Sequence, residues 1–117
     1  MKLLIVGSRS ITKFDLSAYI NGEVDLIISG GANGIDKLAE AYADKKRISK
    51  LILRPNYKKY GKGAPLHRDD EMVDIADAVL AIWDGVSRGT RHTVEYAKSC
   101  GKPITVINPN ADACSEG

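Results

Sequence analysis

A single-domain, three-layer α/β/α sandwich is the fold class that the 117-residue sequence predicts. Five short runs rich in Leu, Ile and Val recur along the chain, and segments of helix length separate them. The runs lack polar alternation, as expected of strands that are covered on both faces. Right-handed β-α-β crossovers would place helices on both faces of a Rossmann-like, five-stranded parallel sheet. The expected strands are residues 2–6, 25–28, 50–53, 78–83 and 103–107.

Helix signals begin in the first two segments between these strands. Thr12 is expected to cap a first helix with Asp15 three residues on, and Asn33 with Asp36 repeats this spacing. Residues at i, i+3, i+4 and i+7 share one face of a helix, so the second helix has an apolar face. That face would consist of Ile35, Leu38, Ala39 and Tyr42.

The third and fourth segments carry helix signals of their own. Pro65 suits the first turn of a third helix, and a fourth is expected over residues 90–100, closed by Gly101 and Pro103. The connection over residues 55–64 is longer than most loops between a strand and a helix, so we expect it to be functional or disordered. The inward side chains of the third helix would be Met72, Ile75 and Ala76.

Length and composition limit the classes of protein. The chain is long enough for one core but too short for two, so we expect one domain over residues 1–108 and a flexible tail over residues 109–117. A net charge of +2 argues against nucleic acid and membranes as partners. No apolar stretch has the length of a signal peptide or a membrane span, so a cytoplasmic location is expected. Metal-ligand spacing is absent around Cys100, Cys114, His67 and His92, so no metal site is expected.

Three of the expected strand-to-helix loops are small, polar and glycine-rich. Because parallel strands send these loops to the same edge of a sheet, residues far apart in the sequence can line one crevice there. The strand order 3-2-1-4-5 makes the three loops neighbours, whereas the order 2-1-3-4-5 separates them, so we expect the first order. The loops are Gly7-Ser8-Arg9-Ser10, Ser29-Gly30-Gly31-Ala32-Asn33-Gly34-Ile35-Asp36 and Asp84-Gly85-Val86-Ser87-Arg88-Gly89-Thr90.

The composition of these loops suits a phosphate or a carboxylate. Glycines let the backbone approach an anion closely, and the N-terminus of a following helix offers unpaired N–H groups with partial positive charge. Arg9, Arg88 or Arg91 would add planar, bidentate contacts. Any α/β protein needs glycine at some turns, but three such loops at one edge favour a ligand site. The Walker pattern and G-x-G-x-x-G are absent from the sequence, so neither P-loop hydrolysis nor ordinary dinucleotide redox chemistry is indicated.

Aromatic rings and positive charge mix in the connection after the third strand. Tyr57, Tyr60 and His67 are candidates for a lid that stacks on a base, with Arg54 and Arg68 nearby. The alternative is a solvated basic loop whose tyrosines pack on the surface. The sequence leaves both interpretations open.

The loop motifs resemble those of a known superfamily. Residues 29–36 resemble the S-G-x-A-x-G-I-D signature of the bacterial DNA-processing protein of natural transformation, and residues 84–90 resemble the glycine-rich G-T loop of LONELY GUY phosphoribohydrolases. Together with Gly7-Ser8-Arg9, these motifs make residues 1–107 similar to the small YspA- or cpYpsA-related domains of the SLOG superfamily. The resemblance implies a Rossmann-like fold that holds a nucleotide-type ligand across the three loops and senses or processes nucleotide derivatives.

The resemblance does not carry over a catalytic residue. The phosphoribohydrolases have a glutamate three residues after the threonine of their G-G-x-G-T motif, and here Thr93 occupies that position. Glu95 lies two residues further on, about 200° around the helix. The first motif glycine is replaced by Val86 or Ser87. The catalytic residue is therefore unassigned, with Asp36, Asp84 and Glu95 as candidates.

The leading hypothesis is a domain that binds a nucleotide-derived ligand, such as a relative of ADP-ribose or of a nucleoside monophosphate. One alternative is a hydrolase of an N-glycosidic or phosphate bond, and another is a single-stranded DNA-binding module, against which the low net charge weighs. Exposed helix faces favour a homodimer or higher homo-oligomer. The expected ligand-binding residues are Gly7, Ser8, Arg9, Ser29, Gly30, Gly31, Ala32, Asn33, Gly34, Asp36, Asp84, Ser87, Arg88, Gly89 and Thr90.

Overall fold

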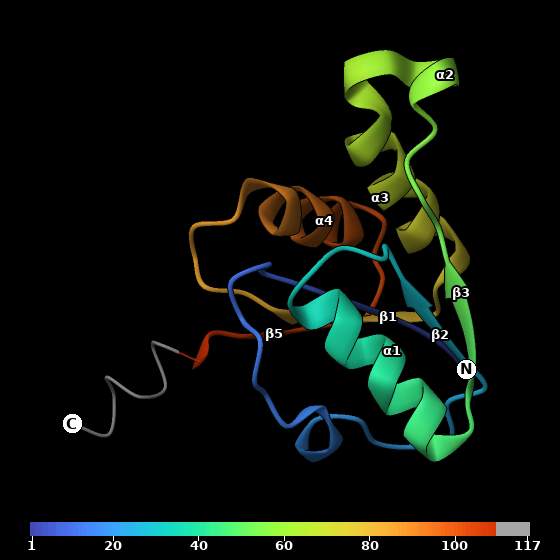
Figure 1. Cartoon of the computed structure of the whole chain (residues 1–117), viewed down its shortest axis with the longest axis vertical. Coiled ribbons are helices and arrows are strands. Elements are labelled where there is room, and N and C mark those ends of the chain that lie inside the picture. Colours follow the sequence, from blue (N-terminus) through green and yellow to red (C-terminus); the bar gives the residue numbers. More distant parts are fainter. Residues whose placement is uncertain (110–117) are drawn as a thin grey trace.

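Five parallel strands form one sheet in the order β3-β2-β1-β4-β5 (Figure 1). This computed structural model describes residues 1–109, so the tail expected over residues 109–117 lies outside the described residues except at its first position, and so does Cys114. The predicted α/β class and the predicted strand order are confirmed. The strands are β1 (Lys2–Gly7), β2 (Leu26–Ser29), β3 (Ser49–Ile52), β4 (Ala78–Ile82) and β5 (Ile104–Ile107).

Helices cover both faces of the sheet and form the two outer layers of the sandwich (Figure 1). On one face lies α1 (Ile35–Lys46), and on the other face α3 (Ala64–Ile75) and α4 (Arg88–Ser99) pack side by side. Each of these three helices connects two consecutive parallel strands, as a β-α-β crossover requires. Across residues 1–109, no helix has the length and apolar character that crossing a membrane requires.

The central strand β1 supplies both cores. Leu4 and Val6 pack beneath α3 and α4, whereas Leu3 and Ile5 pack beneath α1. All four side chains are buried. Because successive residues of a strand point to opposite faces, a strand covered on both faces must be apolar throughout. This requirement explains the uninterrupted apolar run in the sequence.

The first connection is not the predicted α-helix. Between β1 and β2 the chain makes only one 3-10 turn, η1 (Leu16–Ala18), which Asp15 caps by accepting the backbone N–H of Ser17 at 3.1 Å. The helix predicted from Thr12 and Asp15 was therefore wrong. Leu16 is buried, but the other apolar side chains of the segment lie at irregular spacings and are only partly buried. Such a pattern cannot form the continuous stripe that a helix needs to pack on a sheet.

Two further details of the helices differ from expectation. α1 begins after Gly34, which is its N-terminal cap and has a φ of 75°, and Asn33 is exposed without capping the helix. Ile75 is 36% exposed rather than inward, although Met72 and Ala76 are buried as predicted. α3 turns positions 72, 73 and 76 to the core, and Ile75 lies about 100° around the helix from Ala76.

The long connection after β3 is helical. It forms α2 (Tyr57–Tyr60) and η2 (Gly61–Gly63) before α3 begins, and Pro65 lies in the first turn of α3 as predicted. Asn56 caps α2 by accepting the N–H of Lys59 at 3.1 Å. Figure 1 shows α2 and the first turns of α3 projecting beyond the edge of the sheet. This segment therefore forms one wall beside the loops that follow β1, β2 and β4.

Candidate functional site

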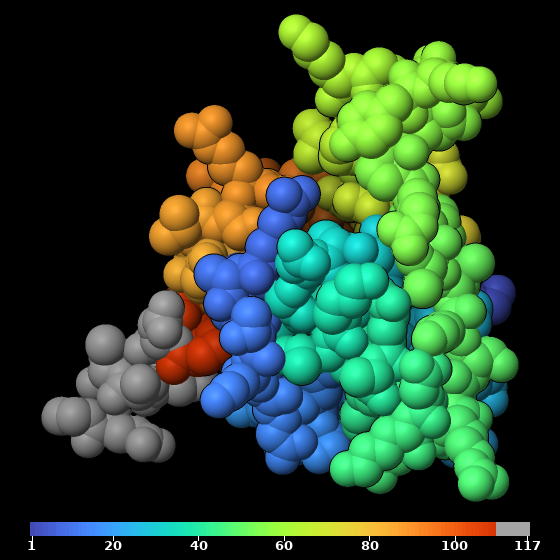
Figure 2. All heavy atoms as spheres, in the orientation of Figure 1, coloured from blue at the N-terminus to red at the C-terminus, as the bar shows by residue number. Residues whose placement is uncertain are grey.

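The three glycine-rich loops meet at the carboxyl edge of the sheet, and Ser8 joins them. Its hydroxyl accepts the backbone N–H of Asp84 at 3.0 Å, and its carbonyl accepts the N–H of Ile35 at 3.4 Å. Ser8 is buried at this junction. Figure 2 shows a notch between the start of α4 (orange) and the α2–α3 segment (green), with the loop after β1 (blue) at its base.

Two of the predicted glycines serve the packing of the loops on one another. A Cβ atom at Gly7 would overlap the carbonyl oxygen of Ile82 and the side chain of Ile35. A Cβ atom at Gly34 would lie 2.5 Å from the carbonyl oxygen of Ser8, and the positive φ of Gly34 also favours glycine. Gly7 and Gly34 are therefore required by the fold itself, before any ligand is considered.

A hollow of about 80 Å³, here called the crevice, lies where the loops meet. It has room for a phosphate or part of a sugar, so a whole nucleotide would extend beyond it. Five residues outside the predicted set also line it, namely the apolar Val6 and Met72 and the polar Arg68, Asp69 and Thr93. The predicted residues that line it are Gly7, Arg9, Ala32, Asp36, Ser87, Gly89 and Thr90.

Two buried carboxyl groups face the crevice, and both Asp36 and Asp69 are only 7% exposed. Burial raises the pKa of Asp36 to about 6, although the N–H of Ala32 and the charge of Arg68 act in the opposite direction. Burial also raises the pKa of Asp69, again against the attraction of Arg68. Carboxyl groups with raised pKa values in a crevice are typical of functional sites.

Arg68 connects these carboxyl groups to the rest of the site. Its Nε donates to the Asp69 carboxylate at 2.8 Å, and its Nη1 donates to the carbonyl oxygens of Gly30 at 2.9 Å and Leu53 at 3.1 Å. One side chain thus joins α3 to the loop after β2 and to the end of β3. Sequence reasoning missed Asp69 and placed Arg68 only near the lid. A carboxylate three residues before Met72, on the inward face of α3, was the available signal.

The loop after β2 already uses some of its N–H donors within the chain. The N–H of Gly31 donates to the hydroxyl of Ser29 at 3.3 Å, and the N–H of Ala32 donates to the carboxylate of Asp36 at 3.1 Å. Asp36 therefore occupies, with its own negative charge, a place where this loop was expected to hold a ligand anion. Asn33 is exposed and lies outside the crevice lining.

The loop after β4 is shaped by Asp84. Its Oδ1 accepts the N–H groups of Val86 at 2.8 Å and Ser87 at 2.9 Å, and these bonds hold the pKa of Asp84 below its usual range. Ser87 then caps α4 by accepting the N–H of Thr90. Asp84 thus positions the start of α4 at the crevice and does not itself line the hollow.

The remaining candidates on α4 lie away from the crevice. Arg91 and Glu95 form an exposed ion pair at 3.0 Å. Arg88 is exposed and does not line the hollow, whereas Thr93 does and donates to the carbonyl of Gly89 at 3.1 Å. Among the described residues, the cations that line the crevice are Arg9 and Arg68.

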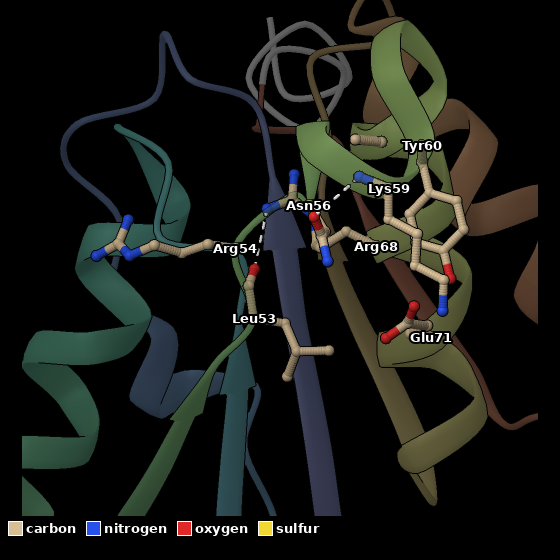
Figure 3. A pocket seen from close by; sticks show the side chains of 8 residues that line it. Leu53, Arg54, Asn56, Lys59, Tyr60, Arg68 and Glu71 are labelled. Atoms are coloured by element: carbon tan, nitrogen blue, oxygen red, sulfur yellow. Dashed lines mark hydrogen bonds between the residues drawn. The ribbon is translucent and has the colours of Figure 1, made fainter.

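A second hollow of about 330 Å³ lies between the end of β3 and the α2–α3 segment, and we call it the basic hollow (Figure 3). Tyr60 lines it and stacks on His67 with ring centroids 3.7 Å apart, whereas Tyr57 is 61% exposed. Arg68 lines both hollows. The residues of the basic hollow are Leu53, Arg54, Asn56, Lys59, Tyr60, Ala64, Arg68 and Glu71.

The histidines and the described cysteine take other roles. His67 pairs with Glu71 at 3.2 Å, and His92 pairs with Asp70 at 2.8 Å. Cys100 is a free, exposed thiol. Over residues 1–109, no group of three or more His, Cys, Asp or Glu side chains is placed to hold a metal ion.

Comparison with known proteins gives one informative match. The Gene 61 protein of Mycobacterium phage D29 is 34% identical to this chain over 85 residues, which cover 68% of each of the two proteins. No family model matches the chain, and no solved structure matches it.

Proposed function

This chain belongs to the same family as the Gene 61 protein of Mycobacterium phage D29, and we propose that it binds a nucleotide or nucleotide-derived ligand over the crevice. The observation that carries the proposal is the meeting of three loops at one hollow that contains two arginines and two buried carboxyl groups. Open α/β sheets bind their ligands at this edge. The complementary groups of a nucleotide are its phosphates and its ribose hydroxyls.

The crevice offers separate partners for these two parts of a nucleotide. Arg9 lines the hollow and forms no ion pair with any residue from 1 to 109, so its guanidinium is available to a phosphate. The start of α4 supports the same phosphate position, since Gly89 lines the hollow at the first turn. Asp36 and Asp69 are acceptors for ribose hydroxyls.

The burial of these two carboxyl groups is better explained by a functional role than by a structural one. The raised pKa of Asp36 means that the folded protein disfavours its charged form, which costs stability at neutral pH. An apolar residue on the same face would avoid this cost. A hydroxyl-bearing ligand that donates hydrogen bonds to the carboxylates would offset it in the complex.

Calorimetry with a panel of nucleoside monophosphates and nucleoside diphosphate sugars tests the proposal. We expect at least one compound to bind, and we expect Arg9→Ala to weaken that binding about tenfold because a charge-assisted hydrogen bond is lost. Arg91→Ala is the matched control, since Arg91 is paired with Glu95 outside the crevice lining and its removal should leave the affinity unchanged. If no compound in the panel binds the unmodified protein, the proposal is wrong.

A second candidate function is hydrolysis of the N-glycosidic bond of such a ligand, and the two carboxyl groups favour it. A group with a pKa of about 6, such as Asp36, is suited to proton transfer near neutral pH. Water would add its hydroxyl to the anomeric carbon and lose a proton to the Asp69 carboxylate. As the C–N bond breaks, protonated Asp36 would donate its proton to the departing nitrogen.

Chromatography of the tightest-binding nucleotide after incubation with the protein separates binding from hydrolysis. If the protein is a hydrolase, a free nucleobase is released. Asp36→Asn should abolish that release while the nucleotide still binds. An unchanged nucleotide after prolonged incubation would exclude the hydrolase and leave the binding function in place.

A further inference from the structure

The basic hollow has an excess of positive charge. It is lined by Arg54, Lys59 and Arg68 and by one carboxylate, that of Glu71. Glu71 is engaged by His67 at 3.2 Å. Within residues 1–109, neither Arg54 nor Lys59 forms an ion pair. Unpaired cations gathered in a concave site attract anions.

Arg68 makes the basic hollow continuous with the crevice. Its Nη1 and Nε are engaged by Gly30, Leu53 and Asp69, but its Nη2 makes no hydrogen bond with any described residue. Arg54 also lines the basic hollow, and its Nη1 lies beside the loop after β2, 3.0 Å from the position that a Cβ of Gly31 would occupy. Figure 3 shows Arg68 in the middle of the hollow, with Lys59, Tyr60 and Glu71 on one side and Arg54 extending away on the other.

We propose that the basic hollow is a second subsite, which holds a phosphate-bearing part of a ligand that contains two nucleotide units. One unit lies over the crevice, and the other reaches across Arg68 into the hollow. This inference rests on the proposed function of the crevice. It is supported by the volumes, because the crevice of about 80 Å³ is too small for a nucleotide, whereas the basic hollow of about 330 Å³ has the size of a ligand pocket.

The three cations have separate tasks in this arrangement. Arg68 is fixed by three hydrogen bonds that leave Nη2 without a described partner, and it lines both hollows. Arg54 and Lys59 are exposed and line the hollow on opposite sides of Arg68, and Lys59 neutralises the second phosphate (Figure 3). Arg68 is therefore the residue common to both units, and Lys59 is specific to the second unit. This difference makes Lys59 the position at which the subsite can be tested alone.

The test compares AMP with two ligands of two nucleotide units by calorimetry. One is 5′-phosphorylated diadenylate, which is joined by a phosphodiester, and the other is diadenosine diphosphate, which is joined by a pyrophosphate. We expect at least one of them to bind about tenfold more tightly than AMP, and Lys59→Ala to remove that gain without changing the affinity for AMP. The preferred compound identifies the linkage.

Lys58→Ala is the matched control, since Lys58 is the exposed neighbour of Lys59 on α2 and does not line the hollow. Equal losses in the Lys58 and Lys59 variants would attribute the effect to general surface charge and overturn the subsite. Binding of AMP with no gain for either longer ligand would also overturn it while leaving the proposed function intact. Absence of any nucleotide binding would instead overturn the proposed function.

Discussion

The carboxylate of Asp36 accepts the backbone N–H of Ala32 at 3.1 Å, so the glycine-rich loop after β2 binds an anion that belongs to the chain itself. Because of this contact, the three loops contribute groups of opposite charge to the crevice. The loop after β2 presents a carboxylate to the crevice, whereas Arg9 and the start of α4 present positive charge. A ligand with both hydroxyl and phosphate groups matches this division.

The first prediction concerns the pH dependence of stability. The pKa of Asp36 is about 6 in the folded protein against a model-compound value of 3.8, so the folded state keeps the proton longer than the unfolded state. This stabilisation is fully present below pH 3.8 and is lost as the pH rises to 6. At about 1.4 kcal/mol for each unit between the two pKa values, the loss is about 3 kcal/mol.

Urea unfolding of the wild type and of Asp36→Asn between pH 4 and pH 7.5 measures this effect. The stability of the variant relative to the wild type should rise by about 2 kcal/mol over that range, because asparagine does not ionise and part of the full loss has already occurred at pH 4. A difference that stays constant with pH would contradict the prediction.

The second prediction concerns the contact between loops. Gly7→Ala should reduce the free energy of unfolding by about 1–3 kcal/mol or more, since its Cβ would overlap the backbone of Ile82. Gly63→Ala is the control, because that position has a negative φ and no atom within 4 Å of an added Cβ. Denaturant unfolding should show the control to be neutral or slightly stabilised. Equal destabilisation of both variants would refute the proposed role of Gly7.

The third prediction tests the inward face of α3. Met72→Ala should lower the free energy of unfolding by about 2–5 kcal/mol because it leaves a cavity beneath the sheet. Ile75→Ala should change it by less than about 1 kcal/mol, since Ile75 is an exposed side chain. Thermal unfolding of the two variants provides the measurement, and a larger loss for Ile75→Ala would show that the face is wrongly placed.

The fourth prediction concerns the pairing of Arg68 with Asp69. Arg68→Met should destabilise the protein by about 3–5 kcal/mol at pH 7, because it leaves a buried carboxylate without its partner. Adding Asp69→Asn to this variant should restore part of the loss, since the unpaired charge is then absent. A double-mutant cycle from urea unfolding gives the coupling, and strictly additive losses would mean that the two side chains act independently.

Much of the fold could be predicted because it depends on local patterns. The apolar runs predicted all five strands, and Pro65 predicted the start of α3. The helix predicted in the first connection was wrong because the signals at Thr12 and Asp15 also suit a single capped turn. No local rule reports whether a continuous apolar stripe that could pack on the sheet follows them. The predicted inward orientation of Ile75 was wrong for a related reason, since periodicity alone does not fix which residues at the border of an apolar stripe face the sheet.

The candidate site could likewise be predicted only in part. The sequence alone determined three glycine-rich loops at one edge of a parallel sheet, because strand direction and crossover handedness follow from general rules. The order 3-2-1-4-5 was predicted because it makes these loops neighbours, and the structure has this order. Only the tertiary structure decided that Arg68 and Asp69 enter the crevice from α3 and that Asp36 turns back onto its own loop. These placements depend on long-range packing of α3 against the loop after β2, which brings together residues 38 positions apart.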